Sequence, residues 1–475
     1  MKSISEYLEE DRIKWSTRPY LTVKDGTWQT RTFRQVIDQI QDLSRGLLLH
    51  GFQNKNIMIF SENSYEWILL YLGIMGYVGT CVPVDKEWTP YDLNHTLSVL
   101  DTAAVFYSRS RSACIDSLRE HYPDTAWFCI EDSLESLAET GHRSGPALTG
   151  RTDLTETALV LFTSGTTNLP KAIPLTQENL FANWETLYRR TPMTAADRSF
   201  VFLPLHHVYT CVANVLYTII SGMELWLNSG FLFLIPELIE ARPTVVCTVP
   251  LILYQMKEAM TEELLETLRA VRWLYCGGSF TDPAVKEYFI QNDISLLEAY
   301  GTTETSSVIA LSVPGDPNTA SNGTVFENLD VRIDCPDEEG IGEIVVRGKS
   351  VSKGYLHRND RYSEFDAEGA YHTGDLGILD ERGHLYLKGR KKRMILTANG
   401  KNIYVEELEA LLLEDPRIKT AKVYEESFHP AAFITANLPE ADVQALLESI
   451  NQKLPPFKQI RTIHIRPDTE GGRIK

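Results

Sequence analysis

The chain has 475 residues, of which 43% are hydrophobic and 23% are charged, and its formal net charge is −18. A chain of this length is too long for one compact core and predicts two or three domains. The composition is that of an ordinary soluble globular protein. The acidic balance argues against a nucleic-acid partner and against docking on anionic membranes, because clustered Lys and Arg side chains bind both kinds of surface.

The cysteines and the apolar segments predict neither secretion nor a membrane span. Seven cysteines are scattered without Cys-x-x-Cys spacing, so we expect no disulfide framework and no zinc site. The first residues lack the apolar core of a signal peptide. Residues 67–84 are uncharged, but Gly73, Gly76, Gly79 and Pro83 favour a buried helix followed by a strand over a transmembrane helix. We therefore expect a cytoplasmic protein with no transmembrane segment.

Helical and strand patterns alternate through the first 300 residues. Helices are predicted at 32–50, 64–76, 90–100, 250–260 and 282–292. Strands are predicted at 56–61, 79–84, 103–107, 158–162, 199–203, 244–249, 271–276 and 295–300. This alternation predicts an α/β fold with layered, mostly parallel sheets.

The pattern changes after about residue 325, where short strands and turn signals become frequent. Short strands at 331–333, 342–347 and 384–388 indicate a small β subdomain. A basic run at 389–393 precedes a helix at 404–414, strands at 420–424 and 431–436, and a helix at 441–454. We predict an N-terminal domain over 1–391 and a small α+β C-terminal domain over 392–475.

The most informative motif is the segment 162–172, which follows the apolar run of a buried strand. Its polar residues are Thr163, Ser164, Gly165, Thr166, Thr167 and Lys171. Backbone N–H groups and hydroxyls in such a turn, with one lysine as a point charge, can hold anionic oxygens. The motif therefore indicates a nucleotide-phosphate site. It is not a Walker loop, because the glycine spacing differs and no Gly-Lys-Ser/Thr closes it; the alternative is a polar surface loop.

Four further motifs follow in chain order. They occupy residues 203–209, 300–304, 371–375 and the basic run 389–392 with its extension 400–403. Each one alone has a plain structural alternative. Residues 300–304 could be a strand-end turn, residues 371–375 a surface turn, and the basic run a solvated face. A lone histidine beside apolar residues, such as His207, is more often structural than catalytic.

In this order, and spread over most of the chain, the five motifs closely resemble the adenylate-forming superfamily. That superfamily contains acyl-CoA synthetases, the adenylation domains of peptide synthetases and firefly-type luciferases. The doubled pair His206-His207 and the segment 63–67 are most similar to the branch of long-chain fatty acid–CoA ligases. The resemblance implies a large N-terminal domain, a small mobile C-terminal domain, and the use of ATP and Mg²⁺.

The resemblance also implies roles for individual residues. Glu304 would be catalytic as the Mg²⁺ ligand, a hard oxygen donor of the kind that this ion prefers. The residues expected to bind ATP or AMP are Thr163, Ser164, Gly165, Thr166, Thr167, Lys171, Tyr300, Gly301, Thr302, Thr303, Asp375 and Arg390. Among these, Tyr300 would stack on adenine, and Asp375 and Arg390 would hold the ribose or phosphate. Asn168 stands where the family usually has a glycine.

The acyl side of the site is expected around the second motif. His207 would lie near the carboxylate and the thiol path, although the neighbouring His206 makes the assignment uncertain by one position. Candidates for an apolar acyl pocket are Tyr209, Val212, Gly277, Gly278 and Ala299. No Asp or Glu occurs at 203–216 to bind the ammonium of an amino acid, so a simple carboxylic acid is favoured, a fatty acid by resemblance.

The small C-terminal domain departs from the family pattern at its end. The family has a catalytic lysine where this chain has Arg473, and Lys475 follows two residues later. Arginine keeps the charge but changes its geometry and reach. Either residue could therefore take the catalytic role, or adenylation could be weak. Lys392 is the expected hinge, and residues 397–401 would line the thiol channel.

The implied reaction has two steps. A carboxylate oxygen attacks the α-phosphorus of ATP to give acyl-AMP and pyrophosphate, and a thiol, most simply that of CoA, then expels AMP. Two alternatives stay open. The acceptor could be the phosphopantetheine arm of an acyl carrier protein, or the chain could be a catalytically weak protein that binds nucleotides or acyl groups.

Overall fold

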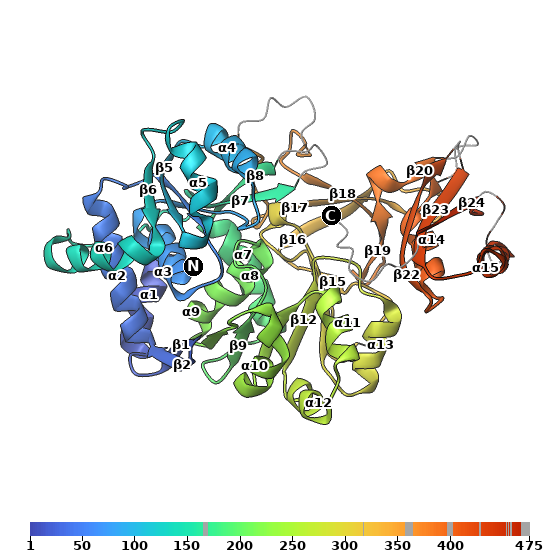
Figure 1. Cartoon of the computed structure of the whole chain (residues 1–475), viewed down its shortest axis with the longest axis horizontal. Coiled ribbons are helices and arrows are strands. Elements are labelled where there is room, and N and C mark those ends of the chain that lie inside the picture. Colours follow the sequence, from blue (N-terminus) through green and yellow to red (C-terminus); the bar gives the residue numbers. More distant parts are fainter. Residues whose placement is uncertain are drawn as a thin grey trace. The chain divides into compact units, whose positions relative to one another are not determined.

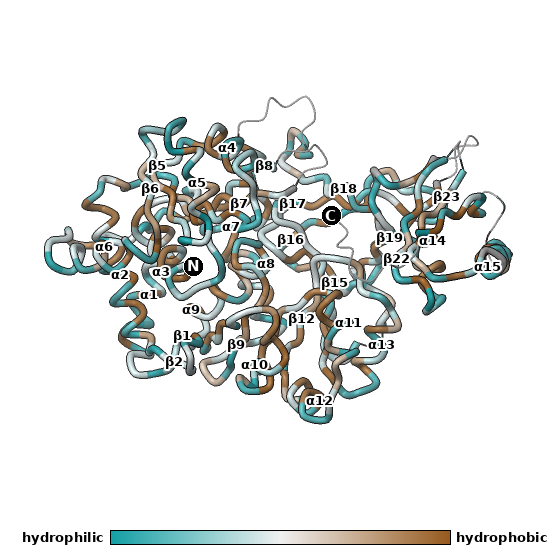
Figure 2. Tube along the Cα trace, in the orientation of Figure 1, coloured by the Kyte–Doolittle hydropathy of each residue, from teal (hydrophilic) through white to brown (hydrophobic). Residues whose placement is uncertain are grey.

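The computed structural model describes residues 1–164, 170–316, 318–356, 364–396, 402–426, 429–452, 454, 456 and 458–466 (Figure 1). The chain divides into two compact units. The first contains Met1–Asp330 and Val346–Tyr371, and the second contains Val331–Val345 and His372–Lys475. Each unit has its own sheets and hydrophobic core, and hydrophobic segments coincide largely with interior strands and inner helix faces (Figure 2).

In its described residues, the first unit has two mostly parallel sheets. One has the order β15-β14-β13-β12-β11-β9-β10-β1-β2, with parallel neighbours from β13 to β1. Its strands are β1 (Pro19–Asp25), β2 (Thr27–Thr32), β9 (Arg198–Val201), β10 (Glu224–Leu227), β11 (Val245–Thr248), β12 (Trp273–Gly277), β13 (Leu296–Tyr300), β14 (Ala310–Leu311) and β15 (Thr324–Val325).

The other sheet of the first unit has the order β6-β5-β3-β4-β7-β8, and its antiparallel pair is β7–β8. Its strands are β3 (Asn56–Phe60), β4 (Thr80–Pro83), β5 (Thr102–Tyr107), β6 (Ala126–Cys129), β7 (Thr157–Ser164) and β8 (Pro170–Thr176). Parallel strands need crossover connections, which helices supply in this unit.

The helices of the first unit begin and end close to local sequence signals. They are α1 (Ile4–Lys14), α2 (Phe33–Leu49), α3 (Tyr65–Gly73), α4 (Pro90–Val99), α5 (Ser112–Arg119), α6 (Ile130–Ser144), α7 (Gln177–Arg190), α8 (Val208–Thr210), α9 (Tyr217–Ser221), α10 (Leu234–Ala241), α11 (Pro250–Glu258), α12 (Glu262–Arg269) and α13 (Pro283–Gln291). Short 3₁₀ turns lie at Arg109–Arg111, Phe231–Phe233 and Thr303–Thr305, and π-helical turns at Ile74–Val78 and Cys211–Leu216. Thr32 and Gln35 form a capping box at the start of α2.

The second unit is smaller and richer in strands. One sheet has the order β16-β17-β18-β19, with β16 (Leu329–Asp334), β17 (Gly342–Gly348), β18 (Tyr371–Leu379) and β19 (Leu385–Arg390). A 3₁₀ turn (Lys391–Arg393) and the pair β20 (Ile395–Leu396) and β21 (Asn402–Ile403) follow. The remaining elements are α14 (Val405–Leu413), β22 (Ile418–Glu426), β23 (His429–Ala436), α15 (Glu440–Gln452) and β24 (Thr462–Arg466). The last three strands form a sheet in chain order.

The predicted α/β class, with mostly parallel sheets and a small β-rich C-terminal part, is confirmed. Residues 67–84 are buried throughout and belong to α3, a π-helical turn and β4. Among the described residues, every helix is too short or too polar to serve as a membrane span. The domain boundary at 391/392 and the hinge at Lys392 stay predictions. Lys392 lies in the 3₁₀ turn Lys391–Arg393.

A buried ion pair anchors β13, the strand that leads into the third motif. Lys286 on α13 pairs with Glu298 on β13, and its ammonium also donates to the carbonyl oxygen of Thr319 at 2.6 Å. Both charged side chains are 9% exposed. Their mutual pairing offsets the cost of removing two charges from water.

Lys286→Met is expected to lower the free energy of unfolding by about 3–5 kcal/mol, because it leaves the Glu298 carboxylate buried without its cation. Denaturant unfolding of the purified variant measures the change. The double variant Lys286→Met/Glu298→Leu serves as the control and should recover most of the loss, because no charge is then left unpaired. A double variant as unstable as the single one would contradict this explanation.

Candidate active site

The predicted phosphate motif begins at the end of a buried strand, as expected, but β7 then folds back as a hairpin. Thr163 of β7 lies opposite Lys171 of β8 in the antiparallel register. Ser164 is the last residue of β7, and the hairpin connection 165–169, with Gly165, Thr166, Thr167 and Asn168, lies outside the described residues. The hairpin places Thr163 and Lys171 side by side at its end.

Lys171 is held by an anion and by an aromatic ring. Its ammonium pairs with the Glu364 carboxylate and lies 4.8 Å from the centre of the Tyr355 ring. The Lys171 side chain is 11% exposed. A lysine fixed in this way offers a localised positive charge at the end of the hairpin, where an anionic phosphate can meet it.

The third motif forms a tight turn at the end of β13. Tyr300 is the last residue of the strand, and Gly301 leads into the 3₁₀ turn Thr303–Thr305. Glu304 in this turn is only 6% exposed, and Tyr355 donates a hydrogen bond to its Oε1 at 2.9 Å. No basic side chain among the described residues pairs with this carboxylate. A buried carboxylate without a cation is costly, and a metal ion would relieve that cost.

A cavity of about 450 Å³ joins the nucleotide and acyl candidates in the first unit. Its lining includes Tyr209, Gly277, Gly278 and Ala299, which were predicted for the acyl group, and His207. Tyr300, Gly301, Thr302 and Thr303, which were predicted for the nucleotide, line the same cavity. Val212 is not part of the lining and is fully buried in the π-helical turn Cys211–Leu216. The proposed acyl and nucleotide positions are therefore contiguous.

The two histidines of the second motif differ in their surroundings. Burial, reinforced by its neighbour His207, lowers the pKa of His206 to about 4. Burial also lowers the pKa of His207, although its side chain is open to the cavity. His206 lies 3.7 Å from the Asp85 carboxylate, whereas His207 lines the cavity. The geometry thus favours His207 as the histidine that meets a ligand.

The second unit brings two predicted ribose-binding residues together. Asp375 on β18 lies opposite Arg390 on β19, and the guanidinium Nε is 2.6 Å from the Asp375 carboxylate. Asp375 is 7% exposed and belongs to a strand, so the interpretation of 371–375 as a surface turn is wrong. An aspartate oriented by an arginine can accept hydrogen bonds from two adjacent hydroxyls.

Another group in the second unit could hold a cation. Ligand atoms of Asp334, Glu343 and His372 lie within 4.8 Å of one another. The Lys391 ammonium is 2.7 Å from Glu343, however, and already supplies a positive charge there. The remaining predicted residues of this region, Arg473, Lys475 and the segment 397–401, lie outside the described residues.

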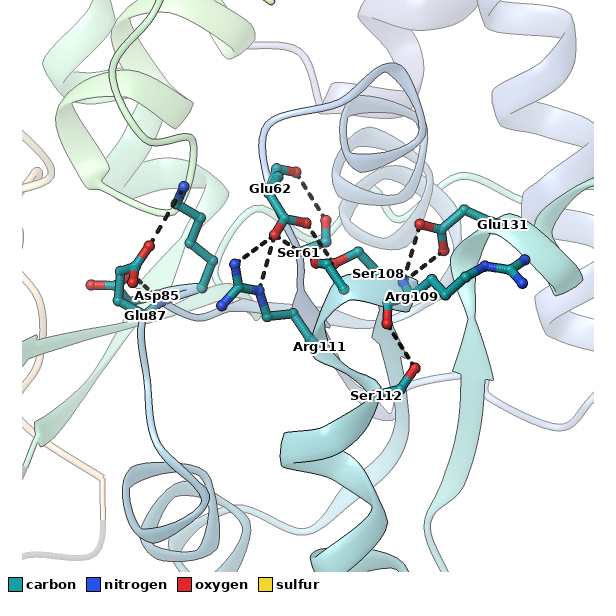
Figure 3. Close-up of polar contacts among 11 residues, drawn as sticks. Ser61, Glu62, Asp85, Glu87, Ser108, Arg109, Arg111, Ser112 and Glu131 are labelled. Carbon is teal, nitrogen blue, oxygen red and sulfur yellow. Dashed lines mark hydrogen bonds and ion pairs between the residues drawn. The ribbon is translucent and has the colours of Figure 1, made fainter. Parts of the chain in front are cut away.

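Sequence patterns missed the groups that support the second motif. The Asn63 side chain donates to the Leu203 carbonyl oxygen at 2.8 Å and accepts from the Leu205 backbone N–H at 2.9 Å. Beside it, Glu62 accepts hydrogen bonds from Ser108 and Arg111, a network at the carboxyl ends of β3 and β5 (Figure 3). Burial alone raises the pKa of Glu62, but hydrogen bonds, with Ser108 the strongest donor, lower it to about 2. A charged, fixed Glu62 thus holds the loop from which Asn63 positions the histidine motif.

Comparison with known proteins agrees with this site. A family model described as AMP-binding enzyme matches residues 9–356. A 2-succinylbenzoate–CoA ligase of Listeria monocytogenes is 30% identical over 484 residues, which cover 98% of this chain and 97% of the relative. A long-chain-fatty-acid–CoA ligase of Mycobacterium bovis is 28% identical over 467 residues, 85% of this chain and 76% of the relative. The o-succinylbenzoate CoA synthetase of Bacillus subtilis, solved with ATP and magnesium, superposes with a TM-score of 0.83 at 21% identity, covering 97% of this chain and 95% of that one.

The chain belongs to the AMP-binding enzyme family, whose model matches well over half of its length. It is an ATP-dependent acid–thiol ligase of the AMP-forming type. The metal in the structure of the Bacillus subtilis synthetase is magnesium. The donor set fits this metal, because the buried Glu304 carboxylate is a hard oxygen ligand that no described cation neutralises.

Proposed function

We propose that the chain activates a carboxylic acid with an apolar body, in the first place a fatty acid, and transfers its acyl group to CoA. The observation that carries this proposal is the continuous cavity, in which the Tyr300–Thr303 segment meets an apolar wall built from Gly277, Gly278 and Ala299. No Asp or Glu is among the described residues that line it. An amino acid would therefore find no partner for its ammonium group, whereas a simple acid needs none.

Individual residues have the following proposed roles. Thr163 and Lys171, with the hairpin connection, hold the β- and γ-phosphates, and Glu304 binds the metal, which neutralises developing charge when it is bound. His207 faces the acid, while Asp375 and Arg390 hold the ribose. A cation near the C-terminus, Arg473 or Lys475, stabilises the α-phosphate. Positioning and charge stabilisation of this kind supply most of the rate in phosphoryl and nucleotidyl transfer.

The proposed second step needs a change of domain position. Rotation at Lys392 would bring residues 397–401 to the thiol path, and the thiol sulfur would then attack the acyl carbon and expel AMP. Domain closure of this kind excludes water from a reactive acyl intermediate. The phosphopantetheine arm of a carrier protein is the alternative acceptor. A cytoplasmic location, where CoA and ATP are available, is part of the proposal.

Acid-dependent exchange of labelled pyrophosphate into ATP tests the substrate class. With saturated acids of increasing length, aromatic acids and amino acids, we expect exchange with fatty acids to exceed background at least about tenfold and that with amino acids to stay at background. Transfer is then followed with CoA and with a holo carrier protein as competing acceptors. Exchange with amino acids alone would contradict the proposed substrate, and exchange with no acid would favour a binding protein.

A further inference from the structure

Tyr355 contacts both charged groups that the proposed reaction assigns to the triphosphate. Its hydroxyl donates to Glu304 Oε1 at 2.9 Å, and its ring lies 4.8 Å from the Lys171 ammonium. Glu304 and Lys171 come from different motifs, 133 positions apart in the chain by their numbering (304 − 171). No other described side chain hydrogen-bonds the Glu304 carboxylate. Tyr355 is thus a physical link between the third motif and the phosphate hairpin.

The backbone around Tyr355 is tied to the same two elements. The Ser352 N–H donates to the Glu304 carbonyl oxygen at 2.7 Å, and the Ser352 hydroxyl donates to the Pro174 carbonyl oxygen at 2.8 Å. On the other side of Tyr355, the Leu356 N–H donates to the Ala172 carbonyl oxygen at 3.0 Å. Because Pro174 and Ala172 belong to β8, residues 352–356 join the Glu304 turn to the hairpin.

The aromatic ring is itself fixed. Phe365 packs edge-on against it, with ring centres 5.4 Å apart and an interplanar angle of 77°. An aromatic face attracts an ammonium group electrostatically, so the ring favours one location for the Lys171 charge. Glu364, next to Phe365, pairs with the same ammonium.

The Tyr355 hydroxyl is the donor of the hydrogen bond to Glu304 Oε1, at 2.9 Å. A phenol hydroxyl donates one hydrogen bond and thereby holds one carboxylate oxygen in place. The second oxygen of the carboxylate then has a defined direction.

We propose that Tyr355 is a positioning residue for the metal-bound triphosphate of ATP. Its hydroxyl sets the orientation of the Glu304 carboxylate, and its ring keeps the Lys171 ammonium at the end of the hairpin. This inference rests on the proposed function, in which Glu304 binds Mg²⁺ and Lys171 binds phosphate. It assigns no chemical step to Tyr355, because neither contact involves the reacting atoms.

Two substitutions separate the hydroxyl from the ring. Tyr355→Phe removes the donor and keeps the aromatic face, whereas Tyr355→Leu removes both. Tyr217→Phe is the matched control, because Tyr217 is fully buried in the same unit and its hydroxyl has no hydrogen-bond partner among the described residues. Thermal unfolding of each purified variant verifies the fold, and Tyr355→Phe decides the question if the leucine variant does not fold.

The first readout is metal binding without turnover. Mn²⁺ is the probe because it is visible by electron paramagnetic resonance, although carboxylate sites generally bind it more weakly than later transition metals. It is titrated with enzyme and a non-hydrolysable ATP analogue. We expect Tyr355→Phe to weaken Mn²⁺ binding about three- to tenfold, because the carboxylate loses its orienting hydrogen bond. Tyr217→Phe should bind like the wild type.

The second readout is the split between kcat and KM in pyrophosphate exchange. Tyr355→Phe should lower kcat at low Mg²⁺ with little change in the KM for ATP, and higher Mg²⁺ should restore part of the rate. Tyr355→Leu should in addition raise the KM for ATP, because Lys171 loses the ring. A Tyr355→Phe enzyme with wild-type Mn²⁺ binding would overturn the inference. Wild-type protein that neither binds Mn²⁺ with the analogue nor catalyses exchange would overturn the proposed function as well.

Discussion

Glu304→Gln is expected to reduce acid-dependent pyrophosphate exchange by at least about a hundredfold while leaving the protein folded and as stable as the wild type. The amide keeps the shape of the side chain and can still accept the hydrogen bond from Tyr355. It lacks the negative charge that makes a carboxylate a good Mg²⁺ ligand. Exchange measured at saturating ATP and Mg²⁺ quantifies the loss.

The stability of Glu304→Gln should not fall along with its activity. The wild-type carboxylate is 6% exposed and has no cationic partner among the described residues, so its charge costs folding free energy. Removing that charge should leave the midpoint of thermal unfolding unchanged or raise it, as is common where a functional site carries strain.

Glu237→Gln is the matched control for this prediction. Glu237 is 1% exposed, but Asn228 and Ser229 donate hydrogen bonds to it and Lys24 pairs with it. Its substitution should lower stability and leave exchange near the wild-type rate. A Glu304→Gln enzyme that turns over normally, or one that is strongly destabilised, would contradict the assignment of Glu304 to the metal.

Local sequence patterns predicted the elements whose stability depends on their own periodicity. The helix predicted at 32–50 is α2, and the strand predicted at 244–249 is β11, because a capped amphipathic run and a bounded apolar run each carry their signal locally. The predicted helix at 64–76 ends as an α-helix at Gly73 and continues as a π-helical turn. That change of winding has no local sequence signal.

Two strands whose own residues are unfavourable for a strand were not predicted. The hairpin strand β8 contains Pro170 and Pro174, which make it a poor strand by propensity, yet it pairs with β7 along its length. Strand β2 is mostly polar and pairs only at the edge of its sheet, next to β1. In both cases pairing with the preceding strand in a hairpin outweighs the propensity of the strand's own residues.

In the site, residues that belong to a sequence motif were predicted, whereas their partners far away in the chain were not. The motifs predicted Glu304 as a metal ligand and Lys171 as a phosphate-binding residue, and the structure places both beside Tyr355. No sequence pattern indicated Tyr355, because a lone tyrosine between two loops has no periodicity. Its hydrogen-bond partner, Glu304, is 51 positions away. Asn63 was noted only within the family segment 63–67, and its supporting role was not predicted, since its hydrogen bonds span about 140 positions.

The backbone around Gly301, the glycine of the third motif, leaves no space for a side chain. A Cβ atom at Gly301 would lie 1.5 Å from the Ser307 carbonyl oxygen and 2.9 Å from the Val308 Cα. Both obstacles are backbone atoms, which cannot rotate away as a flexible side chain could. The backbone around Ser307 is already constrained, with positive φ values of 61° at Ser306 and 116° at Ser307.

Gly301→Ala is therefore expected to abolish pyrophosphate exchange, with a loss of at least about a hundredfold, because the displaced backbone carries Thr303 and Glu304 out of position. The midpoint of thermal unfolding should also fall, which separates this variant from Glu304→Gln. Gly76→Ala is the control: its Cβ would meet Ile4 and Leu8 side-chain atoms at ordinary contact distances of 3.5 Å. Both variants add one methyl group to a glycine of the same unit. A Gly301→Ala enzyme as active and stable as Gly76→Ala would show that the close approach to Ser307 does not determine the geometry of the turn.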